Sequence, residues 1–65
     1  MAANSKNFDY RGYTIEIMPH LGGFQAEVRN AAGTVVHRLP RPEATREAAE
    51  GEAMQFVDSR ADRVS

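Results

Sequence analysis

The chain has 65 residues, a formal net charge of −1 and no cysteine. This length gives one domain near the lower limit for a self-sufficient core, and the lack of cysteine excludes disulfide bonds and thiolate metal sites. No apolar run reaches the roughly 20 residues of a membrane-spanning helix, and the first residues lack the apolar core of a signal peptide. We therefore expect a cytoplasmic protein of bacterial type that gains stability by forming a homodimer.

The first predicted strand covers residues 13–18, where polar and apolar residues alternate. The residues of its inner face are Tyr13, Ile15 and Ile17. Phe8 and Tyr10, further upstream, have the opposite parity, which leaves two arrangements open. A bulge or bend at Gly12 would bring these aromatic side chains to the core face, whereas a straight continuation would leave them on the outer face. Residues 1–7 are expected to form a flexible tail.

The second predicted strand covers residues 24–29 and shows the clearest alternation in the chain. Its inward-facing residues are Phe24, Ala26 and Val28. Residues 19–23 separate the two strands, because proline has no N–H for the ladder and glycine tolerates a positive φ. Residues 30–33 form a short hairpin turn in which Gly33 takes the left-handed conformation.

The third predicted strand covers residues 34–39. The alternation directs Val35, His37 and Leu39 inward and Thr34, Val36 and Arg38 outward. Because both connections between the strands are short, the three strands are expected to form an antiparallel meander.

A change of hydrophobic period follows at residues 40–42, where Pro40 and Pro42 end the sheet. Thr45 is the predicted N-cap of a helix. Its apolar stripe has helical spacing and consists of Ala49, Ala53, Phe56 and Val57. Arg60 falls within this stripe, so either the packed helix ends near Arg60 or its side chain extends along the surface towards water. Residues 61–65 are expected to fray.

These elements predict an α+β fold over residues 8–60: a three-stranded antiparallel meander sheet with one C-terminal helix packed on one face (β-β-β-α, two layers). The other face of the sheet is then open and mostly polar. Its candidate interaction residues are Met18, Gln25 and Val36.

Charge is unevenly distributed, since residues 1–41 carry five cations and three anions, and residues 42–65 carry three cations and six anions. A candidate patch for an anion or nucleic acid lies where the third strand meets the helix. Its members are Arg29, Arg38, Arg41 and Arg46. The alternative is a solvated rim of the sheet. Sheet-based RNA readers stack bases on aromatic residues of the open face, and this face has none unless Phe8 and Tyr10 lie there.

No catalytic set stands out in the sequence. His37 alternates with apolar residues, which is typical of a hydrogen-bonded residue at the edge of a core, and it is also the one candidate for a catalytic base. His20 is expected to be a solvated turn residue. The acidic residues at helical spacing indicate an exposed, solubilising face rather than a metal site: Glu43, Glu47 and Glu50. We expect no enzyme activity, no metal and no cofactor.

Three short motifs carry a resemblance to known proteins: Tyr-Arg-Gly-Tyr at 10–13, Gly-Phe-x-Ala at 23–26 and Thr-Arg-Glu-Ala-Ala at 45–49. The pattern resembles small uncharacterised bacterial β-β-β-α proteins and, more distantly, the N-terminal domain of HicB-type antitoxins. The Pro-Gly-Cys-type segment of HicB domains has no counterpart in this sequence, and neither does their DNA-binding segment after the helix. The resemblance implies the fold and an antitoxin-like regulatory role.

Together these features favour a small non-enzymatic protein-interaction module that self-associates through its open sheet face or a strand edge. A homodimer or a small protein is the expected partner, and no membrane is involved. The alternative is weak binding of nucleic acid through the arginine patch.

Overall fold

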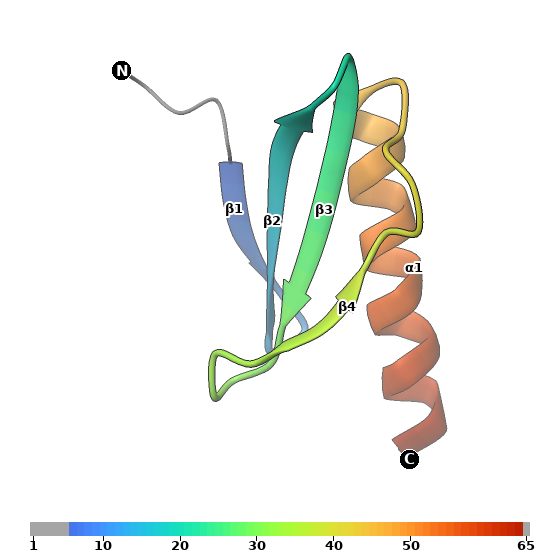
Figure 1. Cartoon of the computed structure of the whole chain (residues 1–65). Coiled ribbons are helices and arrows are strands. Elements are labelled where there is room, and N and C mark those ends of the chain that lie inside the picture. The colour runs from blue at the N-terminus through green and yellow to red at the C-terminus, as the bar shows by residue number, and fades with distance from the viewer. Residues whose placement is uncertain (1–5, 65) are drawn as a thin grey trace.

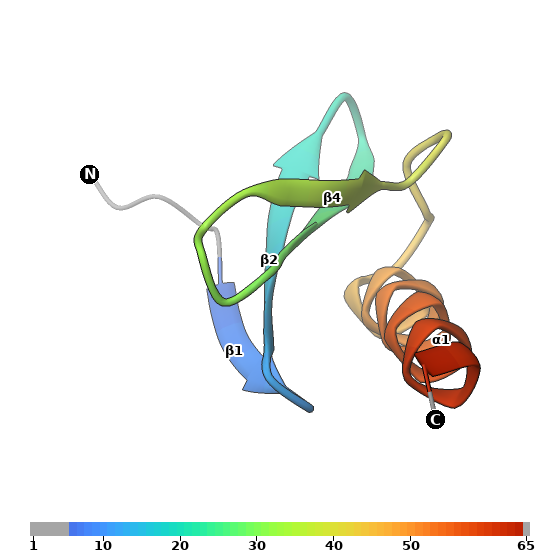
Figure 2. The same ribbon diagram turned by 90° about the horizontal axis from the view of Figure 1, so that it is seen from below.

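The computed structural model describes residues 6–64, with side chains described for residues 6–60. Its elements are β1 (Lys6–Tyr10), β2 (Tyr13–His20), β3 (Gly23–Arg29), β4 (Val35–Arg38) and α1 (Arg46–Val64). The strands form one antiparallel sheet in the order β1-β2-β3-β4, and the helix lies along one side of it (Figures 1 and 2). The expected α+β class and C-terminal helix are confirmed, but the sheet contains a first strand that was not predicted.

The sheet has four strands, so the prediction of three was wrong. The added strand is β1, which begins at Lys6, inside the segment predicted to be a tail. Arg11 and Gly12 have φ values of 52° and 86°, as in a two-residue hairpin turn of type I′. This turn reverses the chain and places Phe8 opposite Ile15, so no bulge is involved. Residues directly opposite share a sheet face, and Phe8 and Tyr10 therefore pack against the core.

A register shift in β4 exchanges the predicted orientations of two valines. Arg29 pairs with Val35 and Val28 pairs with His37, which leaves Val36 as an extra residue between the two pairs. Such a bulge turns the residues on its two sides out of simple alternation. As a result Val35 shares the outer face of Arg29 and is 39% exposed, while Val36 packs against the core. The sequence assigned Val35 to the core and Val36 to the open face, and both assignments were wrong.

The core lies between the sheet and the helix, as the two apolar periodicities predict. Its buried members are Ile15, Ile17, Ala26, Val28, Leu39, Ala49, Ala53 and Val57. The alanines lie where the helix faces the central strands β2 and β3, and their small side chains allow the helix backbone to approach the sheet closely. Phe24 and Phe56 are partly buried at the margin of this core.

The helix begins at the predicted cap, since the amide of Ala48 donates a hydrogen bond to Oγ1 of Thr45 at 3.1 Å. It does not end near Arg60 but continues to Val64, across most of the segment predicted to fray. Arg60 instead extends along the surface: its Nε donates to the Tyr13 hydroxyl at 3.1 Å, and its guanidinium lies 5.7 Å from the ring centre of Phe56. Residues 1–5 and 65, which belong to the two predicted tails, lie outside the described residues.

Candidate functional site

The tip of the β2–β3 hairpin presents the most exposed large apolar side chain among the described residues. Leu21 is 92% exposed and has a φ of 45°, and Gly22 follows with a φ of 83°. Two positive φ values between strands again indicate a type I′ turn, which favours asparagine or glycine at both positions. A left-handed leucine costs about 1–2 kcal/mol because its Cβ approaches the following carbonyl oxygen. The chain therefore carries an apolar group here at a conformational cost and without burying it.

The segment between β4 and α1 lies against this tip. It arches away after Leu39 and returns so that Glu43 pairs with Phe24 through two backbone hydrogen bonds, both 2.8 Å long. Gly23 makes this approach possible, because a Cβ at that position would lie 2.6 Å from the carbonyl oxygen of Glu43. Unlike Gly22, it has no positive φ, so its role is to leave space rather than to permit a turn conformation.

The hairpin tip and the arch lie side by side at one end of the molecule (Figures 1 and 2). Residues of both segments line a shallow hollow. It is lined by Leu21, Gly22, Gly23, Arg41, Pro42, Glu43 and Ala44. We call this set the tip surface. Arg41 and Glu43, on either side of Pro42, supply one charge of each sign. Within the part of the chain whose side chains are described, neither charge has an ion-pair partner.

The open sheet face is occupied by a network of ion pairs. Glu16 and Glu27 lie directly opposite one another on β2 and β3, an arrangement that repels unless cations intervene. Arg29 meets both carboxylates, at 3.6 Å from Glu16 and 3.0 Å from Glu27. Arg38 reaches Glu27 from β4, with its Nε and Nη2 at 3.1 and 2.8 Å from the same oxygen. The face is thus largely neutralised by its own residues.

This network separates the members of the predicted arginine patch. Arg29 and Arg38 lie on the open face with their charges paired, whereas Arg46 lies on the helix side, 5.8 Å from the ring centre of Phe24. Arg41 belongs to the tip surface. The four arginines therefore occupy three different settings and do not form one continuous patch.

The predicted interaction residues are likewise divided. Met18 and Gln25 are directly opposite partners at the tip end of the open face, and both are half-buried. Val36 packs against the core instead. The two residues that do lie on the open face, Met18 and Gln25, therefore belong to the β2–β3 hairpin, whose turn carries Leu21.

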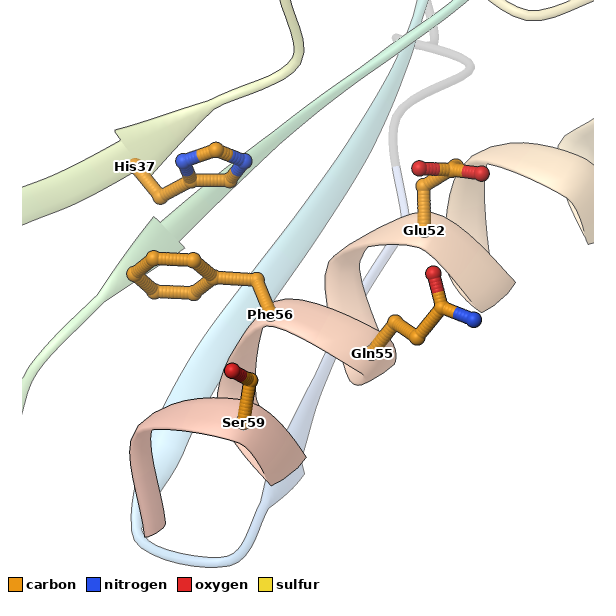
Figure 3. Close-up of a pocket in the computed structure, with 5 residues that line it drawn as sticks. All are labelled: His37, Glu52, Gln55, Phe56 and Ser59. Atoms are coloured by element: carbon orange, nitrogen blue, oxygen red, sulfur yellow. The ribbon is translucent and has the colours of Figure 1, made fainter. Parts of the chain in front are cut away.

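A second hollow lies between β4 and the middle of the helix, and His37 forms part of it (Figure 3). The imidazole stacks on the ring of Phe56, with ring centres 4.1 Å apart and planes 6° from parallel. The other lining residues, all on the helix, are Glu52, Gln55 and Ser59. The sequence predicted a hydrogen-bonded imidazole, but among the described residues the His37 side chain has no hydrogen-bond partner and stacks on Phe56 instead.

Among the described residues, no three histidine or acidic side chains gather closely enough to hold a metal ion. The described part of the chain also contains no helix with the length and apolarity to cross a bilayer. Comparisons with protein-family models, with curated proteins and with solved structures gave no match.

The tip surface was not predicted from the sequence. The signal was present in a leucine placed before Gly22-Gly23, at a turn position where asparagine or glycine is usual. The arch could not be foreseen, because it depends on the pairing of Glu43 with Phe24 across 19 residues of sequence.

Proposed function

We propose that this protein is a non-enzymatic protein-interaction module and that its contact surface is the tip surface. The observation that carries the proposal is Leu21, which combines 92% exposure with a left-handed backbone. Both properties cost free energy in the isolated domain, and neither supports the core. Strain of this kind is typical of positions kept for function, and exposed leucine contributes about 1.5–3 kcal/mol when a partner buries it.

The open sheet face, the strand edge and the arginine patch, which the sequence suggested, have less support. The open face already satisfies its charges internally, so a partner would have to break the Glu27–Arg29 and Glu27–Arg38 pairs or bury them whole. The free edge of β1 is only five residues long and includes the charged side chains of Lys6 and Asp9, features that protect edges from pairing. Nucleic-acid binding needs unpaired cations on one surface, and the arginines are dispersed.

The cytoplasm is the compartment that we propose, because small domains of oxidising compartments are usually held by disulfides and this chain has no cysteine. The relation to HicB-type antitoxin domains stays a prediction from three short motifs. This relation would imply that the tip surface acts within a regulatory protein complex.

Site-specific photo-crosslinking tests the proposal. A photoreactive amino acid replaces Leu21 in one variant and, as the control, the exposed Ala31 in the β3–β4 turn in another. We expect position 21, but not position 31, to form a covalent adduct with another protein chain. Adduct formation at neither position, or equally at both, would overturn the proposal.

A further inference from the structure

We infer that the partner of the tip surface is a second copy of this chain, docked about a two-fold axis. The inference rests on the proposed function and adds the identity of the partner. In a two-fold contact both copies use the same residues, so a surface must be complementary to itself in shape and in charge. The tip surface satisfies both conditions.

Shape provides the first argument. The exposed Leu21 side chain lies beside a hollow of about 410 Å³ whose lining includes Gly22, Gly23 and Ala44, residues with little or no side chain. A projection next to a recess on one surface allows each copy to place its leucine in the recess of the other. Pro42 adds further apolar surface to the lining of the hollow.

Charge provides the second argument. Arg41 and Glu43 lie on the same surface, carry opposite signs and have no ion-pair partner among the described side chains. About a two-fold axis, if Arg41 of one copy faces Glu43 of the other, the reverse pair forms as well. One residue of each sign thus yields two ion pairs and leaves no net charge at the contact. A partner of strongly acidic or basic character would gain from one of these residues and be repelled by the other.

The geometry of the surface is fixed before docking. The two hydrogen bonds between Phe24 and Glu43 hold the arch against the hairpin, so the recess and Leu21 keep their relative position. A contact that is organised in advance loses less conformational entropy on binding. The tip surface contains seven residues, however, against about 20–30 per partner in a standard interface. The dimer is therefore weak, with a dissociation constant in the upper micromolar range or above.

Sedimentation equilibrium of the intact chain over a wide concentration range, at low salt, measures this association. We expect Leu21→Asp to weaken it at least about tenfold, since the aspartate must be desolvated in the apolar recess. Val35→Asp is the matched control, because Val35 is the other exposed large apolar residue within residues 6–60 and lies on the open face. It should leave the association unchanged. Circular dichroism verifies that each variant is folded.

Charge reversal then tests the two-fold pairing itself. Arg41→Glu and Glu43→Arg each place like charges across the contact, and each should weaken self-association about tenfold at low salt. When the two variants are mixed, the glutamates of one face the arginines of the other, and association should return. Recovery on mixing supports the inference, because only opposed copies of this surface bring positions 41 and 43 together.

Failure of the second-copy inference can be distinguished from failure of the proposed function. A chain that stays monomeric at millimolar concentration, yet crosslinks from position 21 to a different protein, overturns the second copy as partner and leaves the proposed function standing. A dimer that is insensitive to Leu21→Asp overturns the assignment of the surface. Absence of both self-association and position-21 crosslinks overturns the inference and the proposed function together.

Discussion

The hydroxyl of Tyr10 donates a hydrogen bond to the carboxylate of Asp58 at 2.9 Å, joining the first strand to the helix across 48 residues of sequence. Arg11, in the adjoining turn, donates to the same carboxylate oxygen at 2.7 Å. The hydrogen bond from Arg11, followed by that from Tyr10, lowers the pKa of Asp58, and the bond to Asp58 is the main cause of the raised pKa of Tyr10. These contacts attach the edge hairpin to the second layer of the fold.

The lowered pKa of Asp58 predicts a dependence of stability on acid. The folded state favours the ionised carboxylate, so this contribution is present above the unfolded pKa near 3.8 and is lost as pH falls through the lower folded value. Asp58→Asn should therefore unfold at a lower temperature than wild type at pH 6. The difference should narrow as pH falls below 4. Thermal melts from pH 2 to 7 measure it, and a difference that stays constant over this range would contradict the assignment.

Gly23 and Gly51 are expected to respond in opposite ways to alanine. At Gly23 the new Cβ collides with the carbonyl oxygen of Glu43 and breaks two backbone hydrogen bonds, at a cost of about 2 kcal/mol or more. Gly51 is exposed in the helix with open space around its Cβ position, so Gly51→Ala should stabilise by about 0.5–1 kcal/mol. Urea denaturation measures both. Equal effects of the two substitutions would rule out the close approach at Gly23.

Leu21→Asn should stabilise the isolated domain. Asparagine tolerates the left-handed region better than leucine, and the change removes an exposed apolar side chain without losing a buried contact, for a gain of about 0.5–1 kcal/mol. Chemical denaturation at low protein concentration, where self-association is negligible, provides the measurement. Val35→Asn serves as the control and should give no such gain, because β4 favours a β-branched residue. A loss of stability in Leu21→Asn would show that Leu21 serves the fold.

Glu27 is expected to be the most sensitive carboxylate of the open face. Its side chain is only 14% exposed and accepts hydrogen bonds from Arg29 and Arg38. Glu27→Ala leaves Arg38 without its carboxylate partner and Arg29 with only the longer contact to Glu16, and should destabilise by about 1–2 kcal/mol. The exposed Glu52 offers the control, with an expected effect of Glu52→Ala within about 0.5 kcal/mol. Denaturant midpoints that agree for the two variants would mean that the network contributes nothing.

Local periodicity was enough to predict the centre of this fold. The alternation around Ile15, Ile17, Ala26 and Val28 and the helical stripe from Ala49 to Val57 identify the buried residues. These positions obey simple periods because each packs on one regular element against another. Turn chemistry also predicted the left-handed Gly33, which has a φ of 87°.

The differences arise where the structure depends on non-local pairing. The Arg11-Gly12 turn is a two-residue reversal without the usual asparagine or aspartate, so β1 was not recognised as a separate strand. The bulge at Val36 depends on the register between β3 and β4, which alternation within β4 cannot specify. The tip surface is formed by a hairpin and an arch that are distant in the sequence. Which of its charged residues lack ion-pair partners depends on the residues that surround them in the folded chain.

The most direct test of the tip surface is the concentration dependence of backbone amide chemical shifts in the wild-type chain. Between about 20 µM and 1 mM, the span in which a weak dimer forms, we expect the amides of Leu21, Gly22 and Arg41 to shift progressively. The amide of Ala31, in the β3–β4 turn, should stay unchanged. Shifts confined to Glu16, Glu27 and Arg38 on the open face, or no shifts at any position, would contradict the account.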